Sequence, residues 1–207
     1  MISLKNLSKR PLSPDDIRTI AQTLATHSDR EAAIVGAAML ESALEDLFRA
    51  RFVVLTPTED DAIFAGHGPL STMSAKIMMA QALNLFSSNV KNDLGTIVKI
   101  RNTFAHGQSN FTMDEHAITQ ACRSLRMKNE ADLFIELKRD KSITFSAILT
   151  EVEDALEGAP QTIAIFDGIE LRMWTDDSLK TKTAFSRTVY YLWLYLHILR
   201  SALTQKT

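Results

Sequence analysis

The chain has 207 residues, of which 45% are hydrophobic and 23% charged, and this balance excludes a protein that is disordered along its length. The formal net charge of −2 argues against nucleic-acid binding that is driven by the overall charge of the chain, although a local basic patch is compatible with it. The one cysteine, Cys122, excludes an internal disulfide and a cysteine-based zinc cluster, and it fits a reducing, cytoplasmic compartment. We expect no cofactor and no metal.

The sequence predicts a short polar arm followed by a single domain. Residues 1–12 are polar and lack the apolar core of a signal peptide, so we expect a loose arm there and a helical domain over 13–207. The most apolar run, Val189 to Leu199, has only eleven residues, whereas a helix that spans a membrane needs roughly 20. We therefore expect this run to be a buried helix or an oligomer contact, with no membrane association.

Helical patterns dominate the chain. One long helix should begin at a capping box, in which the Ser28 side chain accepts the Glu31 N–H and the Glu31 carboxylate accepts the Ser28 N–H. Behind it, apolar residues recur every three or four positions, as on one face of a helix. The predicted helices cover residues 13–26, 28–52, 60–64, 71–86, 89–105, 114–125, 130–137, 144–156 and 183–203.

A different pattern occurs near the C-terminus. Between 161 and 174, apolar residues alternate with polar ones on both sides of Asp167-Gly168, a pair typical of tight hairpin turns. The helices elsewhere predict an all-α helical bundle, to which one small β-hairpin at 161–174 is added.

The helix predicted over 89–105 ends in three polar side chains that are candidates for chemistry. Arg101 continues the apolar stripe of this helix at a position where an aliphatic residue is expected. An inward arginine needs either an acidic partner or a cleft, because burying a lone charge is too costly. Asn102 and His106 are four residues apart and share a face, so the three side chains can converge near the end of the helix.

The acids that could accompany Arg101 are Glu41 and Glu45, four residues apart on the helix predicted over 28–52. In a structural interpretation, one of them pairs with Arg101, and His106 is stabilised by the helix dipole. In a functional interpretation, the same acids support or orient Arg101 beside a substrate. A paired-carboxylate active site and a solvated face are further alternatives for these two residues.

Arg101-Asn102 followed by His106 resembles the R-(polar)-x-x-x-H signature of the HEPN superfamily, a group of small helical bundles. A wider stretch resembles the mannitol operon repressor family, through the segments Gly68-Pro69-Leu70-Ser71, Ser74-Ala75-Lys76-Ile77, Ala82-Leu83 and Ile100 to His106. The resemblance covers residues 25–130, and the helix predicted over 183–203 matches more loosely. Residues 135–180 fit less well, so their role stays open.

The resemblance to the mannitol operon repressor family implies a regulatory protein. We find no helix-turn-helix and no basic recognition helix, so we expect it to act through protein partners rather than by sequence-specific DNA binding. As an HEPN-type protein it would also be a homo-oligomer, since the Arg and His of that superfamily usually lie in a cleft at a dimer interface.

The same resemblance implies an alternative, a metal-independent endoribonuclease in stress response or defence. Arg101 would then hold the scissile phosphate, and His106 would act as general acid or base on the ribose 2′-hydroxyl or the leaving oxygen. Asn102 would orient His106 or the phosphate. The substrate would be RNA, because the attack requires a 2′-hydroxyl.

The two functions make different demands on Arg101. The enzyme requires Arg101 and His106 to be accessible in a basic cleft, whereas a binding module leaves Arg101 paired with an acid. We expect the other conspicuous residues to be structural: Met78 and Met79 should fill the core, and the scattered lysines and arginines should belong to solvated faces.

Overall fold

The structure is a computed structural model that describes Leu24 and residues 27–107, 111–128, 130–139, 161–166, 169–173 and 181–204. The predicted arm at 1–12, the predicted helix at 144–156 and most of the one at 13–26 lie outside the described residues.

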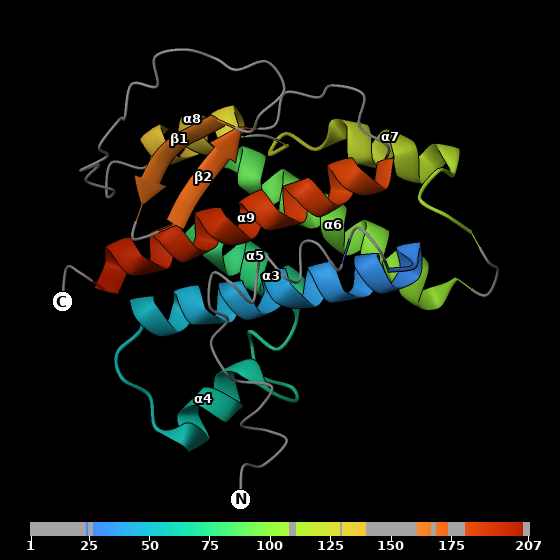
Figure 1. Cartoon of the computed structure of the whole chain (residues 1–207). Helices are drawn as coiled ribbons and strands as arrows, with labels where there is room; N and C mark the ends of the chain where they lie inside the picture. The colour runs from blue at the N-terminus through green and yellow to red at the C-terminus, as the bar shows by residue number, and fades with distance from the viewer. Residues whose placement is uncertain are drawn as a thin grey trace, which may run out of the picture.

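The described part of the chain is a helical bundle, as the sequence predicts. Its helices are α3 (Asp29–Arg51), α4 (Pro57–Phe64), α5 (Met73–Ala82), α6 (Ser88–His106), α7 (His116–Ser124), α8 (Glu130–Arg139) and α9 (Thr181–Thr204). Helix α9 contacts α3, α6, α7 and α8, while α5 packs against α3 and α6 on the other side of the bundle (Figure 1). Helix α4 extends below α3 and α5.

The directions of the three long helices follow from contacts at their ends. Lys182 at the start of α9 lies 3.4 Å from the carboxylate of Asp29 at the start of α3, so these two helices run parallel. Arg30 at the start of α3 donates a hydrogen bond of 2.8 Å to the carbonyl of Gly107, directly after α6. Helix α6 therefore runs antiparallel to both of the others (Figure 1).

The apolar run in α9 forms the centre of the core. Val189 to Leu199 is buried within the chain, apart from the half-buried Tyr190 and His197, which confirms the prediction of a buried helix. Helix α3 approaches this run closely at Gly36, where a Cβ atom would lie 3.1 Å from a methyl group of Val189. In the part of the chain that the structure describes, no helix has the length and apolarity needed to cross a membrane.

Local capping explains where the helices begin. The capping box of Ser28 and Glu31 is present at the start of α3. A second box, between Thr56 and Glu59, starts α4 at Pro57, three residues before the predicted start at 60.

The start of α7 is later than predicted. The helix begins at His116 rather than at 114, with Glu115 as its N-cap, and residues 112–115 form a turn. The Met113 N–H in this turn donates to the carboxylate of Asp29 at 2.8 Å, which ties the turn to the start of α3.

Two strands occur where the sequence predicts a hairpin. Strand β1 (Gln161–Phe166) pairs antiparallel with β2 (Ile169–Met173), from Gln161 opposite Met173 to Phe166 opposite Ile169. The register is irregular between Thr162 and Ala164. The predicted turn at 167–168 lies outside the described residues.

The most deeply buried charge of α6 is Asp93 rather than Arg101. Asp93 is 2% exposed, and its carboxylate accepts the backbone N–H groups of Arg126 at 3.0 and 3.1 Å and of Met127 at 2.8 Å. These bonds tie the segment between α7 and α8 to α6. Burial nevertheless raises the pKa of the Asp93 carboxyl, since the loss of hydration outweighs the hydrogen bonds.

This raised pKa predicts a pH dependence of stability. An acid whose pKa is higher in the folded state contributes stability that is fully present below its unfolded pKa of 3.8 and is lost as pH rises through the folded pKa. In urea unfolding, we expect the stability of the wild type relative to Asp93→Asn to fall as the pH rises above the unfolded pKa of 3.8 and through the higher pKa of the folded state. Asp114→Asn, which changes an exposed carboxylate, is the control; a pH-independent difference for Asp93→Asn would contradict the assignment.

Candidate functional site

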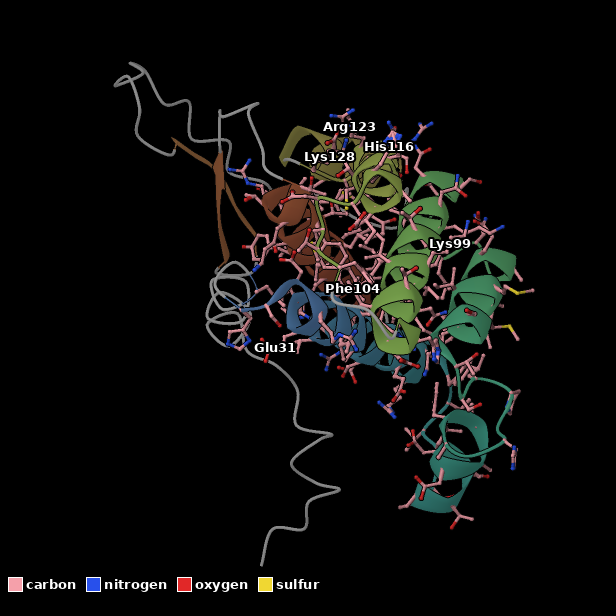
Figure 2. All side chains as sticks on the ribbon, turned by 90° about the vertical axis from the view of Figure 1, so that its right-hand side faces the viewer. Glu31, Lys99, Phe104, His116, Arg123 and Lys128 are labelled. Atoms are coloured by element: carbon pink, nitrogen blue, oxygen red, sulfur yellow. The ribbon has the colours of Figure 1, made fainter. Side chains whose placement is uncertain are left out.

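The solvent-facing ridge of α6 carries two of the three polar residues that the sequence singles out on this helix, Asn102 and His106. Successive residues of a helix are about 100° apart, so Lys91, Gly95, Lys99, Asn102 and His106 fall within an arc of about 80°. All are exposed except the half-buried Gly95, and none is acidic. Figure 2 shows Lys99 on this open side of α6. Asn102 and His106 therefore share a face, as predicted, next to positive charge.

Arg101 lies on a different side of the same helix. It is about 140° from His106 around the helix axis, and its side chain is half-buried beside the apolar stripe of α6. No hydrogen bond joins Arg101, Asn102 and His106 in the described part of the structure. The three side chains therefore do not form one preassembled cluster within a single chain.

The acids predicted to accompany Arg101 are bound by another residue. Lys76 of α5 is 1% exposed, and its Nζ lies 2.8 Å from Glu41 Oε1 and 2.9 Å from Glu45 Oε1. Arg49 also donates to Glu45 Oε2, at 3.0 Å. The predicted ion pair between Arg101 and Glu41 or Glu45 is therefore wrong, because α5 inserts its own cation between the two acids.

Arg101 consequently has no ion pair or hydrogen bond with any residue that the structure describes. Its guanidinium offers several N–H donors in a planar array that suits carboxylate and phosphate groups. A signal for the true partner was present in the sequence, since Lys76 interrupts the apolar spacing of Met73, Ile77 and Ala80. Arg101 interrupts the apolar spacing of α6 in the same way. The sequence analysis singled out the charge at Arg101 and not the one at Lys76.

The end of α6 is held in place by residues that the sequence did not single out. Arg30 binds the Gly107 carbonyl, and the ring of Phe111 lies 4.9 Å from that of Phe104. A Cβ atom at position 107 would come within 2.2 Å of the Phe111 ring, so only glycine fits there. These contacts fix the position at which α6 ends, directly after His106.

Helix α7 adds further positive charge beside α6. His116 and Arg123 are exposed on α7, and Lys128 reaches back to donate a 2.7 Å hydrogen bond to the Arg123 carbonyl (Figure 2). Between 88 and 128, the described acids are the buried Asp93 and the exposed pair Asp114 and Glu115. Exposed lysines and arginines therefore outnumber exposed acids in this described part of the chain.

The chemistry available on this surface is anion binding and proton transfer. Burial raises the pKa of the Cys122 thiol to about 11, so it stays protonated and is a poor nucleophile near neutral pH. In the described ranges, no three His, Cys, Asp or Glu side chains come together in a way that would hold a metal ion. Guanidinium, ammonium and imidazole groups are what α6 presents to a ligand.

Comparisons with known proteins identify no relative of this chain, so the functional argument depends on the geometry of the structure. No protein-family model, no curated protein and no solved structure matches this chain significantly.

The role of Lys76 can be tested by removing its charge. In Lys76→Met, the partly buried carboxylates of Glu41 and Glu45 would lose the cation they share, and among the described residues only Glu45 would keep a partner, Arg49. We therefore expect a loss of about 3 kcal/mol in the free energy of unfolding. Lys99→Met, on the exposed ridge, should change it by less than about 0.5 kcal/mol. Urea unfolding monitored by circular dichroism measures both; equal effects would show that the buried network contributes nothing specific.

Proposed function

We propose that this chain is a HEPN-type protein that acts on RNA as a metal-independent endoribonuclease, with its site at the C-terminal end of α6. The observation that supports this function best is that Arg101 has no ion pair or hydrogen bond with any residue that the structure describes. Lys76 binds both acids that would have neutralised Arg101, so the guanidinium remains available to an anionic ligand. A cytoplasmic location, where RNA is abundant, is part of the proposal.

The proposed roles follow from the chemistry of each group. Arg101 binds the scissile phosphate and stabilises the negative charge that develops on it. His106 transfers a proton to or from the ribose 2′-hydroxyl or the leaving oxygen, a role that suits an imidazole because it titrates near neutral pH. Asn102, one turn before His106 on the same ridge, orients the imidazole or a phosphate oxygen. Lys99 adds attraction for the RNA backbone.

A second function has its own supporting observation. Arg101 and His106 are about 140° apart around α6, so the two side chains do not converge on one phosphate in the isolated chain. That separation favours a regulatory protein of the mannitol operon repressor type, which acts through protein partners and has no catalytic step.

Cleavage of RNA in the presence of EDTA distinguishes the two functions. We expect the wild type to cleave a mixed RNA pool when metal ions are chelated, and Arg101→Ala and His106→Ala each to slow cleavage by about 100-fold or more. His116→Ala removes an exposed histidine of α7 and should retain the wild-type rate.

Two results would contradict the ribonuclease. One is cleavage that is unchanged in His106→Ala, which would identify a contaminant. The other is the absence of cleavage by the wild type, which would favour the regulatory protein. Circular dichroism spectra matching the wild type would show that the variants are folded.

A further inference from the structure

A glycine interrupts the solvent-facing ridge of α6 near the middle of the helix. Gly95 has helical backbone geometry, and glycine inside a helix is less stable than alanine because its backbone loses more conformational freedom on folding. A Cβ atom at this position would meet no atom within 4 Å. Packing within the described part of the chain therefore does not require a glycine here.

The other glycines in the described ranges each have a structural reason. A Cβ atom would come within 3.1 Å or less of a neighbouring atom at Gly36, Gly68 and Gly107. Gly66 has a φ of +57°, which favours glycine over other residues. Gly95 has neither feature, so the reason for its missing side chain lies outside the described fold. Close approach of a ligand to the helix backbone is such a reason.

The charges on either side of Gly95 indicate what kind of ligand this is. Lys91 and Lys99 lie four residues before and after it, each about 40° around the helix axis and about 6 Å along it. Both are exposed, and neither ammonium has an ion pair or hydrogen bond with a described residue (Figure 2 shows Lys99). The one acid of α6, Asp93, is buried about 160° away from Gly95.

The neighbouring helix α5 presents an uncharged face to solvent. Met78, Met79 and Leu83 are 69%, 40% and 44% exposed, so the prediction that the two methionines fill the core is wrong. The only ionisable residue of α5 is Lys76, whose ammonium points into the bundle. Since α5 packs on α6, no acid of this neighbour repels an anion that lies on the ridge.

We propose that a strand of RNA lies along the ridge of α6 and that its sugar–phosphate backbone contacts the helix at Gly95. Lys91 and Lys99 bind phosphates on either side of this contact. The missing side chain lets the strand come close enough to the helix for both ammonium groups to reach it. A glycine alone would also suit a partner helix, but two flanking lysines favour a polyanion.

This inference rests on the proposed function, because the strand that crosses Gly95 continues to Arg101 and His106. Gly95 lies about 16 Å from His106 along the helix axis, so the contact is made away from the scissile phosphate. Gly95 and the two lysines therefore act on the binding of the strand. Their loss should raise KM and leave kcat close to the wild-type value.

The test measures binding separately from cleavage. The probe is a fluorescein-labelled 2′-O-methyl RNA of mixed sequence, which lacks the free 2′-hydroxyl that the proposed cleavage requires. In fluorescence anisotropy with the full chain, we expect Gly95→Leu to raise the Kd at least about tenfold, because the new side chain occupies the place of the strand. The Tm of this variant should equal or exceed that of the wild type, since leucine is the better helix former.

Ala62→Leu is the matched control. It adds a side chain at an exposed position of α4 and should bind the probe as the wild type does. A structural role of Gly95 would lower the Tm and the affinity together, whereas a contact with RNA lowers only the affinity.

The flanking lysines have a separate test. Lys91→Gln and Lys99→Gln should each weaken binding and reduce the slope of log Kd against log salt concentration by about 0.7, the value for one phosphate contact on a single strand. Arg51→Gln removes an exposed charge at the end of α3 and should leave the slope unchanged.

Three results would overturn the proposal: unchanged affinity in Gly95→Leu, a Tm of this variant below that of the wild type, and a wild type that does not bind the probe. The last would point to an acidic protein surface as the occupant. Failure of the ribonuclease looks different. A wild type that binds the probe with the expected pattern of variants but cleaves no RNA would remove the catalytic function and support the contact at Gly95.

Discussion

The buried ammonium of Lys76 organises much of this structure. It joins α5 to α3 through two carboxylates, Glu41 and Glu45, and neither acid has an equally buried alternative partner. Such a network is costly to break because a charge left alone in a dry environment has no compensation. The rotation of α5 about its own axis is set by this contact, since the ammonium must face α3.

Two features of the surface follow from that rotation. Met78 lies about 200° around the helix from Lys76, so a lysine that faces inward turns this methionine outward. At the same time, acids that could have neutralised Arg101 are occupied, and the guanidinium has no ion pair or hydrogen bond with the residues that the structure describes. The uncharged face of α5 and the available cation on α6 thus have a common origin.

A second constraint acts at the opposite end of α3. Asp29 accepts the Met113 N–H and the neighbouring Arg30 donates to the Gly107 carbonyl, so consecutive residues hold both sides of the connection between α6 and α7. This clamp sets the end of α6 and, with it, the position of His106.

The amino-acid sequence by itself determined the helical class, the capping box of α3, the end of α6 at Gly107 and the burial of the run in α9. These features depend on local spacing and on side-chain chemistry within a few residues. The partners of charged side chains were decided only by the tertiary structure. Lys76, Arg101 and Asp93 all interrupt apolar positions in the sequence, and spacing cannot tell which of them meets an opposite charge. That choice depends on how distant helices pack and on the free energy of burying each charge.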